Sequence, residues 1–207
     1  MISPVVLTES VLIIPVHDQV FSTKALCDFL LVLRKRLAPV VVDLGPAVGS
    51  NVSFLGEQLG CKLFVVDLLS ELDLVKSSDD RESILRLDNA DMSVDGIFCW
   101  DVLDYLDQET GRMVAEEVKR VLRPGGVVML CYGMEPSFET EQSRYEIIDD
   151  SSLLYRLDNS TRQKKRVLQT REMSRLFEPL TIENSFLLSN QMREMLFRKP
   201  ISTATGY

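Results

Sequence analysis

Two short β-branched runs, residues 40–44 and 63–67, flank a glycine-containing turn and a helical pattern. Both runs are apolar enough for buried strands, Ser50 or Asn51 can cap the helix between them, and Gly60 marks its end. A strand, a tight loop, a helix and a second strand in roughly 30 residues form a βαβ unit. Such a unit has parallel strands and a right-handed crossover, so it predicts an α/β fold.

The same alternation continues along the chain. A helical pattern that Ser22 can cap and Pro39 ends precedes the βαβ unit. Strands are predicted at residues 84–88, 96–100 and 127–132, with a closing pair at 180–188 and 192–197, and helices at 113–122 and 170–177. Residues 135–165 are mixed polar and charged, which indicates an insertion over one face of the sheet.

These patterns predict one Rossmann-like domain over residues 1–207, with a doubly wound sheet that is mostly parallel, an antiparallel closing strand pair and helices on both faces. The chain of 207 residues is 45% hydrophobic and 26% charged, the balance of an ordinary globular domain. Its formal net charge is −8, so its field repels a phosphate backbone and we expect no nucleic-acid partner. The basic run at 162–166 is interpreted as a solvated surface.

We expect a cytoplasmic protein without a membrane partner. Apolar runs fall short of the roughly 20 residues that cross a bilayer, and the N-terminus lacks the pattern of an export signal. Cys27, Cys61, Cys99 and Cys131 lie far apart and are interpreted as reduced core thiols. With His17 as the one histidine, we predict no metal site. The pattern does not indicate an oligomeric state.

The loop after residues 40–44 is the expected ligand site, because open α/β sheets bind ligands at the carboxyl ends of their strands. Gly45, Ala47 and Gly49 let the backbone pass close beneath a ligand. Asp67 ends the second strand 24 residues beyond Asp43, about where doubly wound folds place a carboxylate that binds both ribose hydroxyls. Both features indicate a ligand that contains a nucleoside.

In the order of its motifs, the chain resembles the class I S-adenosylmethionine-dependent methyltransferases over residues 39–199. Their first motif, a strand that ends in an acidic residue before x-Gly-x-Gly-x-Gly, resembles residues 43–49, with Ala47 at the middle glycine. Their ribose-binding carboxylate corresponds to Asp67. Their third acidic residue, which contacts adenine, corresponds to Asp88. Residues 95–103 and 123–127 are similar to their fourth strand and to the turn before their fifth.

The resemblance implies S-adenosylmethionine as the cofactor. The positions that match the family's binding residues, or lie beside them, are Asp43, Gly45, Pro46, Ala47, Gly49, Asp67, Leu68, Asp88, Asn89 and Trp100. A nicotinamide cofactor is disfavoured, because G-x-G-x-x-G would place Ala47 and Ser50 at its second and third glycines.

Each motif also has a structural interpretation. Residues 45–49 can be only a tight turn, Asp67 a helix cap and Asp88 an exposed loop acid. Trp100 is either a core aromatic or a residue that stacks on adenine or shapes a substrate pocket.

The predicted function is methyl transfer to an unidentified acceptor, with a small molecule favoured. After its fourth strand the chain has residues 99–102, Cys-Trp-Asp-Val, and not the Asn/Asp-Pro-Pro-Tyr/Phe sequence common in enzymes that methylate nucleic-acid bases or glutamine. Catalytic residues stay unknown, although a hydroxyl acceptor would need a base, for which Asp101 and Tyr105 are the candidates. The alternative is a degenerate relative that serves as a non-catalytic binding or regulatory subunit, which Ala47 and the lack of a recognisable catalytic set favour.

Overall fold

The computed structural model describes residues 18–75, 78–134, 142–158, 162, 164–165, 167–188 and 192–201. In chain order the elements are β1 (Gln19–Ser22), α1 (Ala25–Leu33), β2 (Val40–Asp43), α2 (Gly49–Leu59), β3 (Lys62–Val65), α3 (Leu68–Asp73), α4 (Ser78–Leu85), β4 (Val94–Trp100), the 3-10 helix η1 (Val102–Tyr105), α5 (Gln108–Val121), β5 (Leu122–Gly133), β6 (Gln142–Asp149), β7 (Ser152–Asp158), α6 (Thr170–Leu176), β8 (Thr181–Leu187) and β9 (Met192–Arg198). Strands and helices alternate from β2 to β5, as the sequence predicts.

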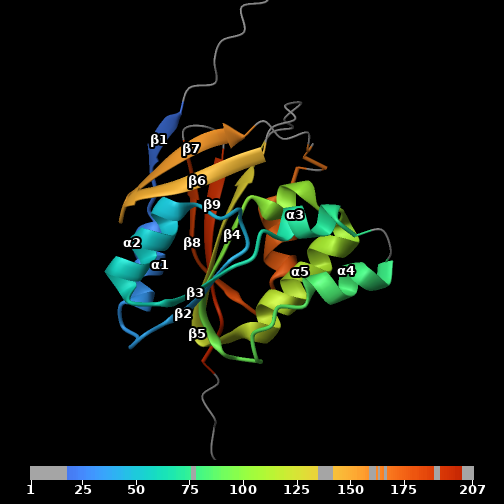
Figure 1. The fold of residues 1–207 in the computed structure, drawn as a ribbon, viewed down its shortest axis with the longest axis horizontal. Helices are drawn as coiled ribbons and strands as arrows, with labels where there is room; N and C mark the ends of the chain where they lie inside the picture. The colour runs from blue at the N-terminus through green and yellow to red at the C-terminus, as the bar shows by residue number, and fades with distance from the viewer. Residues whose placement is uncertain are drawn as a thin grey trace, which may run out of the picture.

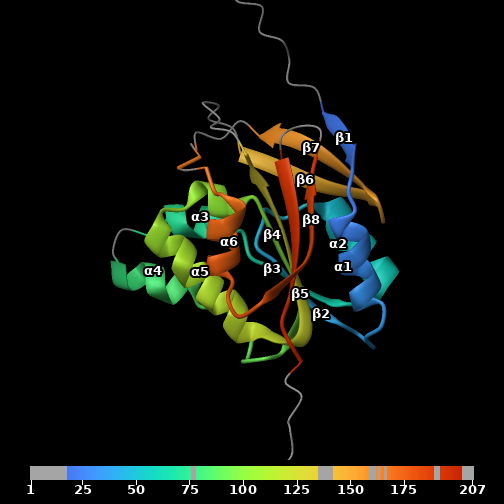
Figure 2. The ribbon, with the colours of Figure 1, turned by 180° about the vertical axis from the view of Figure 1, so that it is seen from behind.

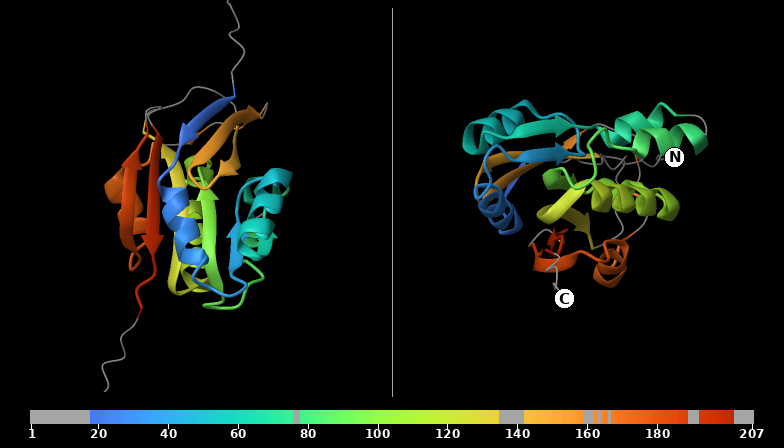
Figure 3. Two further views of the ribbon diagram at one scale, coloured as in Figure 1. Left: turned by 90° about the vertical axis from the view of Figure 1, so that its left-hand side faces the viewer. Right: turned by 90° about the horizontal axis from the view of Figure 1, so that it is seen from below.

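The central sheet, seen nearly edge-on in Figure 1, has the strand order β3-β2-β4-β5-β9-β8. Its first four strands are parallel, and Val42 of β2 lies between Phe64 of β3 and Ile97 of β4. The strands β9 and β8 run antiparallel, with Phe197 paired to Val128 of β5. They form one edge of the sheet, shown in red in the left panel of Figure 3. The predicted fold class is confirmed.

Helices cover both faces of this sheet. α1 and α2 lie on one face, and α3, α4, α5 and α6 lie on the other (Figures 1 and 2). Successive side chains of a strand point to opposite faces. Phe98 and Met129 therefore join the core around α1, whereas Ile97 and Val128 join the core around α5 and α6. In the described part of the chain, no helix is both long and apolar enough to cross a membrane.

Residues 84–88 do not form the predicted strand, which corrects the sequence analysis. Ser78–Leu85 is helix α4, and the chain that follows it is irregular. Its backbone is bound by α5 instead of a neighbouring strand, because the N–H of Leu87 donates a 2.7 Å hydrogen bond to Glu117. β3 is therefore an edge strand, and Asp88 lies exposed outside the sheet.

The predicted helix caps at Ser22 and at Ser50 or Asn51 are wrong in position. Ser22 belongs to β1, and the hydroxyl of Thr23 accepts the backbone hydrogen bond at the start of α1. The N-cap residue of α2 is Val48, which makes no side-chain cap, whereas the side chain of Asn51 binds β6. Each helix therefore starts beside the predicted residue but uses different contacts.

The described part of the predicted insertion forms a second sheet. β6 and β7 make an antiparallel hairpin, and β1 adds to it in the order β1-β7-β6. This sheet lies across the end of the central sheet, not over one of its faces as predicted (Figure 1). Arg34 holds the hairpin turn through two 2.7 Å hydrogen bonds to Asp150. The hairpin therefore lies where the parallel strands end.

Candidate functional site

Asp43, Asp67 and Trp100 lie at the same edge of the sheet, because β2, β3 and β4 are parallel. Asp43 is the last residue of β2, and Trp100 is the last residue of β4. Asp67 follows β3 and is the N-cap residue of α3. The fold thus brings together the predicted ligand residues of three strands, with Gly45 two residues after Asp43.

The carboxylate of Asp43 is buried and bound by the protein itself. Its Oδ1 accepts a 3.0 Å hydrogen bond from the N–H of Gly45 and a 2.7 Å hydrogen bond from Nε1 of Trp100. Burial raises the pKa of Asp43 to about 6, although both hydrogen bonds lower it. Asp43 therefore ties the glycine loop and the indole to the end of β2.

The glycine loop lies directly beneath an indole ring. A methyl group on Gly45 would lie 2.6 Å from Cδ1 of Trp100, which leaves no room for a larger residue. A methyl group on Gly49 would meet no described atom within 4 Å. Ala47, which departs from the family motif, is exposed to solvent. The close approach that the sequence predicts for a ligand is made here by a side chain of the chain itself.

Trp100 stacks between two other aromatic rings. The ring centroids of Phe98 and Trp100 are 4.8 Å apart at 6° between planes, and those of Trp100 and Tyr145 are 5.1 Å apart at 4°. Trp100 has a φ of 44°, a left-handed conformation that is unfavourable for a bulky residue, and is 4% exposed. Trp100 is thus a buried aromatic that also forms a wall of the candidate site, and its role in cofactor binding stays a prediction.

The groove above the glycine loop is nearly filled. It retains a cavity of about 10 Å³, roughly the space of one water molecule. Its lining residues are Gly45, Pro46, Val48, Leu69, Trp100, Asp101, Val102 and Tyr145. Pockets for organic ligands typically measure about 300 Å³ or more. As arranged, these side chains leave no space for a nucleoside.

The other predicted cofactor residues lie around this groove or away from it. Asp67 Oδ1 accepts a 3.2 Å hydrogen bond from the N–H of Ser70, so its interpretation as a helix cap is confirmed. Leu68, the next residue, is buried. Asp88 and Asn89 lie in the irregular segment beside α5. The cofactor-binding roles of all these residues stay predictions.

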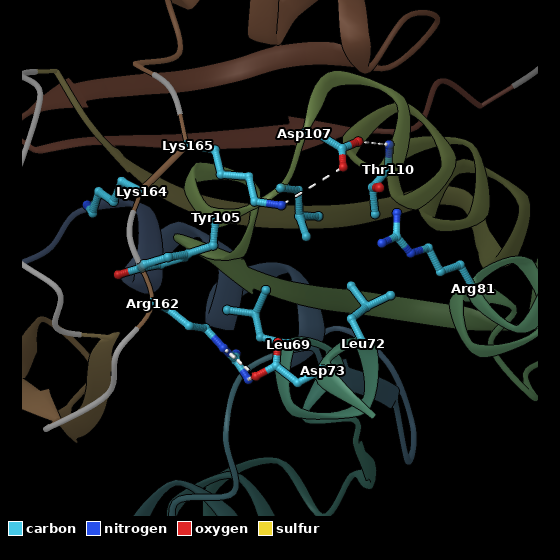
Figure 4. Close-up of a pocket in the computed structure, with 11 residues that line it drawn as sticks. Leu69, Leu72, Asp73, Arg81, Tyr105, Asp107, Thr110, Arg162, Lys164 and Lys165 are labelled. Carbon is cyan, nitrogen blue, oxygen red and sulfur yellow. Dashed lines mark hydrogen bonds and ion pairs between the residues drawn. The ribbon is translucent and has the colours of Figure 1, made fainter. Parts of the chain in front are cut away.

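A cleft of about 580 Å³ adjoins the groove (Figure 4). It is lined by Leu69, Leu72, Asp73, Arg81, Tyr105, Leu106, Asp107, Thr110, Arg162, Lys164 and Lys165. Leu69 lines both the groove and the cleft. Arg162 pairs with Asp73, and Lys165 lies 4.0 Å from Asp107, which also caps α5 (Figure 4). The cleft is therefore walled by paired charges and a few apolar side chains.

A buried charged cluster supports the wall between the groove and the cleft. Asp104 accepts 3.0 Å hydrogen bonds from Nζ of Lys164 and from the N–H of Gly133. Burial raises the pKa of Asp104 to about 6, although Lys164 lowers it. The hydroxyl of Tyr105 donates a 3.4 Å hydrogen bond to Asp101. Of the candidate bases, Asp101 thus lines the groove and Tyr105 lines the cleft.

Sequence reasoning misses Asp104 and Lys164. Asp101, Asp104 and Asp107 recur at intervals of three, a helical spacing that could have singled out the middle residue. Lys164 belongs to the basic run that was predicted to be a solvated surface. That prediction is wrong for Arg162 and Lys164, whose side chains are only 18% and 15% exposed.

Comparison with known proteins agrees with this geometry. Residues 42–130 match the family model of a methyltransferase domain. The 1,6-didemethyltoxoflavin-N1-methyltransferase of Burkholderia thailandensis, solved with 1,6-didemethyltoxoflavin and S-adenosylhomocysteine bound, is 18% identical, with 86% of this chain and 79% of that chain covered and a TM-score of 0.53. The PH0226 protein of Pyrococcus horikoshii OT3 is 19% identical, with 84% and 88% covered and a TM-score of 0.53. No curated protein matches the chain.

The predicted resemblance is thereby confirmed: residues 42–130 match a methyltransferase domain, and the chain has the fold of S-adenosylmethionine-dependent methyltransferases. The cofactor predicted from the sequence, S-adenosylmethionine, is the methyl donor that this family uses. The side chains above Gly45 do not fit this cofactor as they are arranged, because Trp100 and Tyr145 take up the groove.

Proposed function

We propose that this chain is a methyltransferase whose acceptor is a small molecule bound in the cleft of Figure 4. The cleft carries the proposal, because its volume of about 580 Å³ lies within the roughly 300–1,000 Å³ of small-molecule sites. It also adjoins the glycine loop, since Leu69 lines both spaces. Tyr105 and Asp107 line the cleft from the segment that follows β4.

The proposal assigns the cofactor to the carboxyl edge of β2, β3 and β4. Asp67 is proposed to accept hydrogen bonds from the ribose hydroxyls, and Gly45 to lie against the cofactor. Both residues are at the ends of parallel strands, where ligands of this fold class bind.

A second candidate is a methyltransferase-like protein that binds a partner or ligand without catalysis. The stack of Trp100 over Gly45 favours it, because the space that a cofactor needs is already taken. In this case the cleft would hold a ligand that is not methylated.

Calorimetric titration of S-adenosylhomocysteine into the full chain separates the two candidates. Methyltransferase function predicts binding that weakens at least tenfold in Asp67→Asn, which keeps the helix cap because Asn caps as well as Asp. Glu71→Gln, an exposed change on the same helix, is the matched control and should bind as the parent does. If the parent protein does not bind S-adenosylhomocysteine at millimolar concentration, the result contradicts methyltransferase function and supports the second candidate.

The proposal also includes a cytoplasmic location and no nucleic-acid partner. Cys27, Cys61, Cys99 and Cys131 are all free thiols, which agrees with a reducing compartment. The formal net charge of −8 disfavours a polyanionic partner.

A further inference from the structure

We infer that Trp100 and Tyr145 form a built-in plug, which competes with S-adenosylmethionine for the groove above Gly45. The inference concerns the regulation of the proposed cofactor site and rests on that proposal. It makes Trp100 a residue that sets cofactor affinity.

The indole of Trp100 covers the features that should face a ligand. It lies close enough to Gly45 that even one added methyl group would approach it to 2.6 Å. It donates a hydrogen bond to Asp43 Oδ1, the oxygen that also holds the glycine loop. The remaining cavity of about 10 Å³ cannot admit any part of a nucleoside. Cofactor binding in this groove therefore requires the indole to leave.

Tyr145 holds the indole in place from the hairpin side. Its ring lies parallel to the indole, and it is buried. Asn51 of α2 donates a 2.8 Å hydrogen bond to the carbonyl oxygen of Tyr145 and accepts a 2.7 Å hydrogen bond from the N–H of Ile147. The helix that begins at the glycine loop is thus bound directly to β6, the strand that carries Tyr145.

The hairpin is anchored at its turn as well. Arg34 forms a two-bond ion pair with Asp150, and the N–H of Thr23 donates a 2.8 Å hydrogen bond to the carbonyl oxygen of Ser151. β1 pairs along β7 at the outer edge. The Tyr145 half of the plug is therefore part of a three-stranded sheet that is fixed to α1 and α2, so its displacement requires a concerted movement of that sheet.

Displacing the indole of Trp100 breaks its two ring stacks and its hydrogen bond to the carboxylate of Asp43. It also releases the strain of the left-handed backbone conformation of Trp100. Interactions of this kind together correspond to an affinity loss of about tenfold to a thousandfold. A protein without the indole should bind the cofactor more tightly by about this factor.

The test compares the binding of S-adenosylhomocysteine to the parent, Trp100→Ala and Trp100→Phe by calorimetry, after circular dichroism has shown that each variant is folded. Phe29→Leu is the matched control, because the ring of Phe29 packs at a tilt against Phe98, on the other side of Phe98 from Trp100, and does not line the groove. We expect Trp100→Ala to bind at least tenfold more tightly than the parent, Trp100→Phe to lie between them, and Phe29→Leu to match the parent.

Trp100 is the only tryptophan of the chain, so its fluorescence reports on the plug directly. If the parent binds, saturation should shift the emission to longer wavelength as the indole meets water. Binding by the parent with unchanged emission, or equal affinities of the parent and a folded Trp100 variant, overturns the plug and leaves the proposed methyltransferase standing.

The opposite result, binding by Trp100→Ala or Trp100→Phe but not by the parent, supports the plug and contradicts the proposed activity of the parent. If the parent and every folded Trp100 variant fail to bind S-adenosylhomocysteine at millimolar concentration, the plug is not what keeps the cofactor out of the groove. Both proposals are then overturned.

Discussion

Trp100 and Asp43, at the ends of the neighbouring parallel strands β4 and β2, are joined by a 2.7 Å hydrogen bond from Nε1 to Oδ1. The same oxygen accepts a hydrogen bond from the N–H of Gly45. One carboxylate thus couples the backbone of the glycine loop to the ring that covers it, and changes at any of the three residues should affect the other two.

The buried carboxyl of Asp43 should make stability depend on pH. Its pKa is raised from 3.8 to about 6, so between about pH 4 and pH 6 the folded state holds a proton that the unfolded state has lost. The free energy of unfolding is therefore highest below this window and decreases as pH rises through it, by on the order of 3 kcal/mol. Asp43→Asn removes the titration while it keeps an acceptor oxygen.

The measurement is urea unfolding of the parent and Asp43→Asn at several pH values from 4 to 7. The free energy of unfolding of the parent minus that of the variant should decrease as pH rises across the window. A difference that stays flat or increases with pH contradicts the raised pKa of Asp43.

Gly45→Ala should destabilise the fold, because the added methyl group would lie 2.6 Å from Cδ1 of Trp100. Displacing the indole from its stack should cost about 1–3 kcal/mol. Gly49→Ala is the control, since no described atom lies within 4 Å of its added methyl group. Urea unfolding followed by tryptophan emission compares them, and equal stabilities of the two variants would count against the close contact.

Asn51→Ala should loosen the hairpin that carries Tyr145. The change removes two buried hydrogen bonds between α2 and β6, together worth about 1–3 kcal/mol. Hydrogen exchange should show faster exchange at the amide of Ile147, with little change in β4. Ser53→Ala, an exposed change on the same helix, serves as the control. Unchanged protection of Ile147 in Asn51→Ala would show that the hairpin is held by other contacts.

Lys164→Met should be strongly destabilising, because it leaves Asp104 buried without its cationic partner. Loss of one partner of a buried pair costs about 3–5 kcal/mol. The neighbouring change Lys165→Met breaks an exposed 4.0 Å pair with Asp107 and should cost less than about 0.5 kcal/mol. Chemical unfolding of both variants at pH 7 measures the contrast. Similar costs for the two lysines would contradict the buried pair.

Local patterns predicted most of the fold. β2 begins with an apolar run because both faces of a parallel sheet are covered there, and Gly60, with a φ of 55°, ends α2 where the sequence indicates. The predicted strand at 84–88 failed because a short apolar run fits a helix or an irregular segment equally well. Its structure is decided by contacts such as that of Leu87 with Glu117, which lies far away in the sequence.

Only the part of the candidate site that lies at the ends of the parallel strands could be predicted from the sequence. Asp43, Gly45 and Trp100 meet because strand ends share one edge, and this follows from the topology alone. The stack of Tyr145 on Trp100 depends on how the inserted hairpin folds back over that edge, which no spacing in the sequence reveals. The pair of Asp104 and Lys164 was missed for the same reason.

The central claim, that the indole of Trp100 fills the groove, is tested most directly by acrylamide quenching of the intrinsic fluorescence of the parent without ligand. Because Trp100 is the only tryptophan and is 4% exposed, we predict emission at short wavelength, weak quenching, and a large red shift on unfolding in urea. Emission and quenching of the folded protein that match those of the unfolded chain would contradict the filled groove.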